Sequence, residues 1–265
     1  MKSSKYQYVC QDIVRIIGRK ELFKNKTFKE AVKATKNKLH QISGAYFRGR
    51  PKYKLWLKKL EEANKKNDKN NFENICIDIM GFHSSTQERI EILDRFYRDI
   101  FSQLPPIHSI LDVACGLNPL SIPWIPISNS VLYFAYDINK DLIEFLNRFM
   151  DIVNIQGYAE VRDVLFNPPQ IKADLALILK TLPCFDQIDR SATLRILDKI
   201  NAGYIIISFP VKSLGGKEKI MIKNYTTRFK ELIQSKDWTI KRIEFKTELV
   251  FLVNRKGSQS IHSKQ

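Results

Sequence analysis

The strongest constraint on the fold is an alternation of apolar runs with helical patterns from residue 107 onward. The apolar runs are Ile107–Val113, Ser130–Tyr136, Gly157–Val161, Ala173–Leu179 and Tyr204–Phe209, and the helical patterns are Lys140–Met150 and Arg190–Ile200. Trp238–Lys246 and Glu248–Val253 are expected to close the sheet as a pair. Strands and helices in this order predict an α/β protein with a doubly wound, mainly parallel sheet. Such a sheet binds ligands at the carboxyl ends of its strands.

Residues at three consecutive strand ends have the chemistry of a nucleoside site. Gly116 follows the first strand, where a residue without Cβ lets a ligand approach the backbone. Asp137 is placed to accept hydrogen bonds from both ribose hydroxyls. Asp163, followed by Val164, is placed to accept one from an adenine amino group. The alternative is a purely structural role, in which these acids only cap loops.

The turn after the first strand distinguishes between two cofactor classes. A dinucleotide site needs a glycine-rich turn around the pyrophosphate, and residues 114–119 read ACGLNP, with one glycine. S-adenosylmethionine contains ribose and adenine but no phosphate. The sequence therefore predicts S-adenosylmethionine as the cofactor, bound by Gly116, Asp137, Asp163 and Val164.

The positive charge is concentrated toward the amino terminus. The net charge is +16, of which residues 1–80 carry +12 and residues 81–265 carry +4. A helical spacing of apolar residues runs through the basic part, at Phe28, Val32, Thr35 and Leu39. We expect a basic helical domain over residues 1–80 that binds a polyanion, and a catalytic domain over residues 81–265.

The absence of certain sequence features predicts a cytoplasmic location and no metal site. No apolar run approaches the roughly 20 residues that a membrane span needs, and the first residues lack the apolar stretch of a secretory signal. The cysteines (Cys10, Cys76, Cys115, Cys184) form no C-x-x-C pair, and the four histidines show no metal spacing. We expect a cytoplasmic monomer without a metal ion or a membrane partner.

Several segments together resemble one enzyme family, the aminoglycoside-resistance 16S ribosomal RNA (guanine-N7) methyltransferases, which modify guanine-1405. The matching segments are Lys38–Gln41, Gly44–Tyr46, His83–Arg89, Leu111–Leu120, Asp174–Pro183, Ile207–Lys217 with Met221 and Asn224-Tyr225, and Glu248–Val250. The resemblance implies a class I, S-adenosylmethionine-dependent methyltransferase domain with a Rossmann-like sheet. It also implies a helical amino-terminal domain that docks on the assembled 30S subunit. The sequence departs from the family pattern at Ile220 and Lys223 in the predicted RNA-facing loop.

The expected chemistry needs no general base, because guanine N7 carries a lone pair and no proton. Positioning and electrostatics are therefore expected to carry the catalysis. Ser85 and Glu88 have capping-box spacing, and such a cap would fix Arg89 to bind the cofactor's carboxylate bidentately. Lys180, after the fourth strand, and Lys212 are predicted at the target nucleotide. Phe209 suits either a stacking role on the base or a core position.

Two groups of residues are predicted to contact RNA. The first is a set of phosphate-binding side chains in the basic part, namely Lys33, Lys36, Lys38, Arg48, Arg50, Lys52 and Lys54. The second lies in a loop over Ser208–Tyr225, with Lys217, Lys219, Met221 and Lys223 toward the RNA.

Two other functions compete with this interpretation. A methyltransferase acting on a small molecule explains the nucleoside site but leaves the basic part without a role. A non-catalytic RNA-binding protein explains the charge but not the presence of Arg89, Gly116, Asp137 and Asp163 together.

Overall fold

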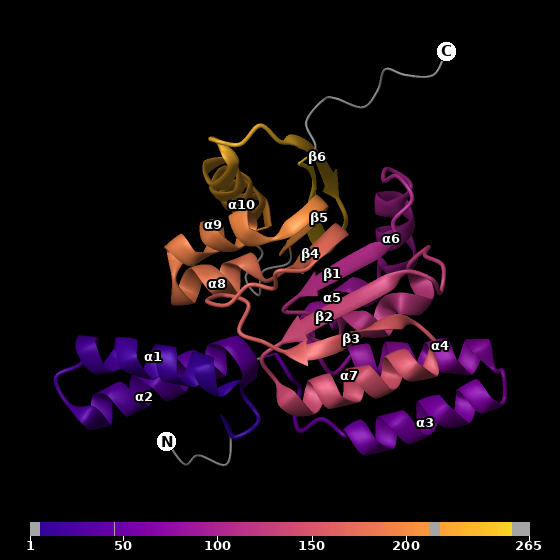
Figure 1. Ribbon diagram of the computed structural model, residues 1–265, viewed down its shortest axis with the longest axis horizontal. Coiled ribbons are helices and arrows are strands. Elements are labelled where there is room, and N and C mark those ends of the chain that lie inside the picture. Colours follow the sequence, from indigo (N-terminus) through magenta and orange to yellow (C-terminus); the bar gives the residue numbers. More distant parts are fainter. Residues whose placement is uncertain (1–5, 45, 212–217, 256–265) are drawn as a thin grey trace.

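A computed structural model of the protein describes residues 6–44, 46–211 and 218–255. It consists of one sheet with helices on both faces, and a helical hairpin beside the carboxyl ends of the central strands (Figure 1). The sheet has seven strands in the order β3-β2-β1-β4-β5-β7-β6. The strands are β1 (Ser109–Val113), β2 (Leu132–Asp137), β3 (Gln156–Val161), β4 (Lys172–Leu179), β5 (Asn201–Pro210), β6 (Thr239–Glu244) and β7 (Glu248–Asn254).

The pairing of the strands confirms the predicted α/β fold. β1 to β5 pair in parallel, whereas β7 runs antiparallel to both β5 and β6. The order reverses direction at β1, because β2 lies on one side of it and β4 on the other. A doubly wound sheet opens its ligand crevice at such a reversal.

The helices cover both faces of the sheet, because the central strands are apolar on both sides. They are α3 (Tyr53–Lys65), α4 (Lys69–Met80), α5 (Ser84–Ile90), α6 (Leu93–Phe101), α7 (Lys140–Ile152), α8 (Leu182–Ile188), α9 (Arg190–Lys199) and α10 (Glu218–Ile233), with a 3₁₀ turn, η3 (Asn118–Trp124). Alternate strand residues enter different cores: Ile110 packs with α3, α4, α6 and α7, and Leu111 packs with α8, α9 and α10.

The helices of the basic part divide into two groups. α3 and α4 share one hydrophobic core with the sheet, through side chains such as Trp56 and Phe72. α1 (Gln11–Lys24), α2 (Phe28–Leu39) and the π-helical turn η2 (His40–Gly44) instead pack around a small cluster of their own, which includes Ile17 and Leu39. The division into domains at residue 80 stays a prediction, but the helical hairpin α1–α2 is the part with a separate core.

Two local predictions are wrong. α5 begins at Ser84 with His83 as its N-cap and no side-chain cap, so Ser85 and Glu88 form no capping box. Glu88 instead pairs with Lys180, which competes for its carboxylate. The predicted loop over Ser208–Tyr225 is shorter than expected, because β5 extends to Pro210 and α10 begins at Glu218.

Within the described ranges, no helix is long and apolar enough to cross a bilayer. The same part of the chain has no group of three or more His, Cys, Asp or Glu side chains arranged to hold a metal ion.

Candidate active site

A cavity of about 690 Å³ lies at the carboxyl ends of the central strands. Its walls come from the ends of β1, β2 and β4, the turn after β3, and α8, while Ile13 of α1 and Ile42 of η2 close it from the hairpin side. Four predicted cofactor residues line it together, namely Gly116, Asp137, Asp163 and Val164.

Asp137 is held in place by backbone donors. Its Oδ2 accepts a hydrogen bond from the Gly116 N–H at 3.1 Å, and its Oδ1 accepts one from the Asn139 N–H at 3.0 Å. Burial raises the pKa of Asp137, and the backbone N–H groups oppose that shift. The carboxylate therefore links the turn after β1 to the end of β2 on the cavity wall.

Gly116 lies against an imidazole ring. Its φ is +52°, a conformation that favours glycine, and a Cβ there would lie 3.1 Å from His83 Cε1. The His83 ring stacks on Tyr46, with ring centroids 5.5 Å apart, and both residues line the cavity. Burial, followed by the charges of Lys180 and Arg89, lowers the pKa of His83 to about 4. The imidazole is neutral at physiological pH.

Asp163 carries an unpaired acceptor. Its Oδ1 accepts hydrogen bonds from the N–H groups of Leu165 at 3.1 Å and Phe166 at 3.3 Å. Its Oδ2 is buried and, among the described residues, has no hydrogen-bond partner. Burial raises the pKa of Asp163 to about 6, although the two N–H groups oppose it. A buried oxygen without a partner is costly, so this oxygen indicates a ligand that donates a hydrogen bond.

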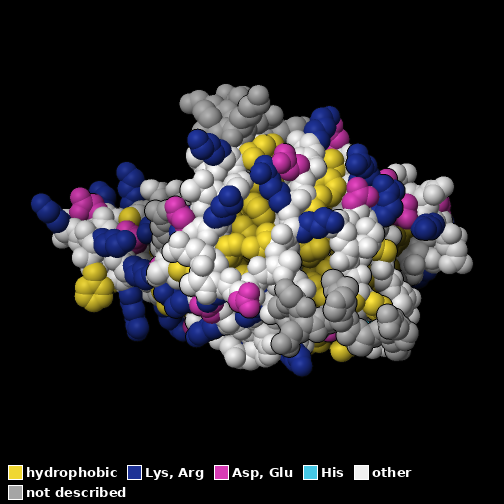
Figure 2. Space-filling view, turned by 90° about the horizontal axis from the view of Figure 1, so that it is seen from above, with side chains coloured by type: hydrophobic (Ala, Val, Ile, Leu, Met, Phe, Trp, Pro, Cys, Tyr) yellow, Lys and Arg dark blue, Asp and Glu magenta, His cyan; other side chains and the backbone are white. Residues whose placement is uncertain are grey.

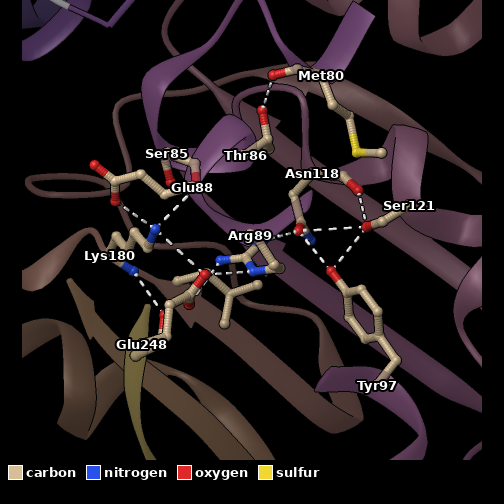
Figure 3. Close-up of polar contacts among 12 residues, drawn as sticks. Met80, Ser85, Thr86, Glu88, Arg89, Tyr97, Asn118, Ser121, Lys180 and Glu248 are labelled. Atoms are coloured by element: carbon tan, nitrogen blue, oxygen red, sulfur yellow. Dashed lines mark hydrogen bonds and ion pairs between the residues drawn. The ribbon is translucent and has the colours of Figure 1, made fainter. Parts of the chain in front are cut away.

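A buried ionic network lies beside the cavity (Figure 3). The Arg89 guanidinium donates from Nε to Glu248 Oε1 at 2.8 Å and from Nη2 to Glu248 Oε2 at 3.0 Å. Lys180 Nζ donates to the Ser85 carbonyl at 3.0 Å and to Glu88 Oε2 at 2.7 Å, and lies 3.3 Å from Glu248 Oε1. Glu248 thus compensates two buried cations from the amino end of β7.

The positive charges of the network explain why the Glu248 carboxyl group is ionised. Burial alone would raise the pKa of its carboxyl group, but the positive charges of Arg89 and Lys180 hold that pKa below its usual value. The carboxylate stays ionised in the interior, which an isolated buried carboxylate would not.

The Arg89 guanidinium is engaged by Glu248 and Asn118. Its side chain is 2% exposed, and it is not among the residues that line the cavity. The two donors that suit bidentate binding of a carboxylate face Glu248, and Nη1 donates to Asn118 Oδ1 at 2.7 Å. The capping box that was expected to aim Arg89 at the cofactor is absent. Its observed contacts join α5 to β7 and η3.

Lys180 lies on the cavity wall at the end of β4, as predicted, in a left-handed backbone conformation with φ +58°. Its ammonium group donates hydrogen bonds to the Ser85 carbonyl and to Glu88, and it forms an ion pair with Glu248. In this arrangement Lys180 positions α5 against the sheet.

A second buried polar group, centred on Asn118, holds the Arg89 side chain in place. The sequence analysis did not predict it. Asn118 Oδ1 accepts from Arg89 and from the Tyr97 hydroxyl, while its Nδ2 donates to Asp112 Oδ2 at 2.9 Å. Burial raises the pKa of Asp112 to about 6, against the hydrogen bonds from Asn118 and Tyr133. An acid inside the apolar strand β1 was the available signal, because a buried acid needs donors from other elements.

The predicted RNA-binding side chains differ in their surroundings. Six of the seven in the basic part are exposed, as are many of the Lys and Arg side chains drawn in Figure 2. Lys38 is the exception, because its Nζ lies 2.9 Å from Glu21 Oε1 in an ion pair within the hairpin. Lys223 of α10 is exposed and Met221 is half-buried. Lys212, Lys217 and the side chain of Lys219 lie outside the described residues.

Phe209 has a core position. It is 2% exposed and stacks on Tyr225 of α10, with ring centroids 4.8 Å apart. Together with Asn224 and Arg228 these residues line a second, shallower depression of about 860 Å³ beside α8. Phe209 supports the floor of that depression and does not present a free face to a base.

Comparison with known proteins gives the same fold and function class. A family model described as "Ribosomal RNA methyltransferase (FmrO)" matches residues 2–252. A protein of Micromonospora rosea named 16S rRNA (guanine(1405)-N(7))-methyltransferase is 34% identical over 256 residues, which cover 96% of this chain and 93% of that protein. A protein of the same name from Serratia marcescens is 32% identical, over 97% of this chain and 96% of its own length.

Solved structures resemble this one over nearly the whole chain. The 16S rRNA methyltransferase RmtF in complex with S-adenosyl-L-homocysteine has a TM-score of 0.81 at 25% identity, covering 95% of this chain and 93% of its own. The 16S rRNA methylase RmtB has a TM-score of 0.76 at 29% identity, covering 96% and 94%.

Proposed function

Because this chain belongs to the FmrO family of ribosomal RNA methyltransferases, we propose that it transfers a methyl group from S-adenosylmethionine to N7 of guanine 1405 in 16S ribosomal RNA. The observation that carries the proposal is the family match over nearly the whole chain, to relatives named for this reaction. The product would protect the ribosome against aminoglycosides that contact this base edge.

The cavity residues suit S-adenosylmethionine. We propose that the Asp137 carboxylate accepts from the ribose hydroxyls and that Asp163 Oδ2, buried and unpaired, accepts from the adenine amino group. Val164 and the Gly116 backbone would complete the nucleoside walls. When bound, the cofactor supplies an electrophilic methyl group on a positively charged sulfur.

The protein's share of the chemistry is positioning. Guanine N7 attacks with its own lone pair, so no residue has to remove a proton. His83 is neutral at physiological pH and adds no charge to the cavity wall. The charges of Arg89, Glu248 and Lys180 are paired with one another or with Glu88. These ion pairs hold α5, β4 and β7 together beside the cavity. Lys180 and Arg89 are thus proposed as positioning residues.

The substrate side of the proposal concerns the exposed cations. We propose that the protein acts as a cytoplasmic monomer on 16S ribosomal RNA in the assembled 30S subunit. Its phosphate contacts would come from Lys33, Lys36 and the exposed cations between Arg48 and Lys54. Lys212, Lys217, Lys219, Met221 and Lys223 remain predicted contacts near the target nucleotide.

Primer-extension mapping of 16S ribosomal RNA from a sensitive bacterium that expresses the chain tests the reaction. The proposal requires a new modification at guanine 1405 and protection against gentamicin and kanamycin. Asp163→Ala should abolish both and weaken S-adenosylmethionine binding in calorimetry, whereas Asp151→Ala, a matched change of an exposed acid, should alter neither. A native protein that binds the cofactor but leaves guanine 1405 unmodified contradicts the proposal and favours a small-molecule substrate.

A further inference from the structure

The turn that joins α1 to α2 exposes large apolar side chains. Phe23 is 93% exposed, the highest value among the exposed large hydrophobic residues of the described chain, and Phe28 is 73% exposed. Leu22 beside them is half exposed. Phe28 begins the helically spaced row that continues through Thr35 and Leu39, and these two later residues are buried whereas Phe28 is not. We call Phe23 and Phe28 the aromatic tip.

The exposure of the two rings follows from the local structure on either side of this turn. The buried row of α1 consists of Ile13, Ile17 and Glu21, at steps of four residues, and Phe23 lies two residues past that row. Thr27 and Glu30 form a capping box that fixes the first turn of α2, with Phe28 as its first residue. Neither ring therefore turns into the small core of the hairpin.

The aromatic tip lies away from the cavity and the sheet. The hairpin projects sideways from the body of the protein, and its turn is at the outer end (Figure 1). The hairpin contacts the body at its base, where Cys10 N–H donates to the Ile138 carbonyl, and again one turn before Phe23, where Lys20 pairs with Asp189 at 3.1 Å. The cofactor and the hydrophobic cores are thus excluded as partners of the tip.

The surroundings of the tip are basic. Arg19, Lys24, Lys26, Lys29 and Lys33 form no ion pair within the described residues. The two acids of this stretch are already engaged: Glu21 pairs with Lys38, and Glu30 belongs to the capping box. Figure 2 shows the projecting hairpin with many Lys and Arg side chains and an exposed hydrophobic group at its outer part. This charge favours a polyanion over an apolar protein surface.

We propose that the aromatic tip binds unpaired bases of the ribosomal RNA by stacking, while the surrounding lysines hold the adjacent phosphates. Aromatic rings next to cations are the combination by which proteins bind unstacked bases, since each base offers a flat π face and each nucleotide a phosphate. The sugar-phosphate surface of a duplex would need the lysines alone. The proposal rests on the proposed function, because it names how the same RNA substrate is held.

Equilibrium binding of variants to intact 30S subunits tests the proposal, with methyl transfer measured in parallel. Phe23→Ala should weaken binding about 5- to 150-fold, the range of one lost base–aromatic stack. Phe23→Trp should retain the affinity, and Phe23→Leu should lose it, because leucine keeps the apolar volume without the π face. The slope of binding against salt should stay unchanged in all three, whereas Lys26→Gln should lower it by about 0.7, the value for one phosphate contact to a single strand. Leu194→Ala, a partly exposed position on α9, is the matched control.

The outcomes separate the two claims. If Phe23→Leu binds 30S subunits as tightly as the native protein, the tip fits an apolar pocket of a ribosomal protein and the stacking proposal is wrong. If Phe23→Ala binds as tightly and the native protein still methylates, the tip has no role and the proposed function stands. If the native protein neither binds nor methylates 30S subunits, the proposed function fails. Cofactor affinity should be equal in every tip variant, because the tip is remote from the cavity.

Discussion

The hairpin α1–α2 and the network beside the cavity use the same residue types in opposite ways. Lys180 is buried, and its ammonium group has three oxygen partners. Lys33 and Lys36 are exposed and, within the described chain, have no ion-pair partner. Charges that organise the site are neutralised inside the protein, where leaving one unpaired costs several kcal/mol. Charges that bind a polyanion stay free in water, where their pairing would be worth little to stability.

The largest effect is expected from the buried network. Glu248→Gln removes the only acidic partner of Arg89 among the described residues and leaves both it and Lys180 buried with less compensation. The free energy of unfolding should fall by about 3–5 kcal/mol, as for other broken buried pairs. Chemical denaturation measures it. Glu244→Gln, a surface partner of Arg242, should change it by less than about 1 kcal/mol.

If Glu248→Gln and Glu244→Gln lower the free energy of unfolding equally, burial does not determine how much an ion pair contributes to stability. The proposed difference between buried and exposed charges would then be wrong.

The second effect belongs to the hairpin and concerns binding instead of stability. Lys33→Glu with Lys36→Glu should lower affinity for 30S subunits by on the order of 100-fold and reduce the slope against salt, because phosphate contacts release counterions. Lys38 is left unchanged, since it pairs with Glu21. Filter binding over a salt series measures the effect.

The control for this charge reversal is Lys199→Glu with Lys241→Glu, at exposed positions of α9 and β6. It changes the net charge equally and should cause a much smaller loss. Equal losses for the two pairs would indicate a general attraction by net charge and no specific docking by the hairpin.

Two glycines give opposite predictions in the two regions. Gly116→Ala places a Cβ 3.1 Å from the His83 ring at a φ of +52°, so it should cost about 1–2 kcal/mol of stability and weaken cofactor binding. Gly18→Ala in α1 meets nothing within 4 Å and should stabilise the protein by about 0.5–1 kcal/mol, because alanine favours a helix. Thermal unfolding measures both. His83→Ala in the Gly116→Ala background should recover part of the loss.

A further effect is a pH dependence of cofactor binding. Burial raises the pKa of Asp163 to about 6, so its carboxylate, the better acceptor, forms between about pH 5 and 7. Cofactor affinity should rise over that range by at most about tenfold. Calorimetry should find this rise flattened in Asp163→Asn, which does not titrate. A native affinity that is constant from pH 5 to 7 would contradict the proposed role of Asp163 Oδ2.

The same raised pKa has a defined sign for stability. The folded protein holds the proton of Asp163 more tightly than the unfolded chain, so this group lowers the free energy of unfolding as pH rises from about 4 to 6. Cofactor binding and stability thus have opposite dependences on the same proton.

Local pattern determined the sheet and the cofactor end of this protein. Period and length of the apolar runs identified the strands, because a strand buried on both faces is recognisable without its neighbours. The carboxyl ends of parallel strands meet at one edge, so Gly116, Asp137 and Asp163 could be placed together from their positions alone. The resemblance of short segments to one family added the reaction, and the family match agrees with it.

Only the tertiary structure decided which side chains pair with which. Arg89 and Glu248 are 159 residues apart, and Lys180 and Glu88 are 92 apart. Pairing of buried charges depends on which elements the fold brings into contact, and capping-box spacing at Ser85 carried no information about it. The exposure of Phe28 had the same origin, since the helical period marks an apolar row but not where the partner helix ends. The sequence thus identified the candidate cofactor residues. Tertiary packing decided which buried charged side chains pair beside the cavity, and it left the aromatic tip exposed to solvent.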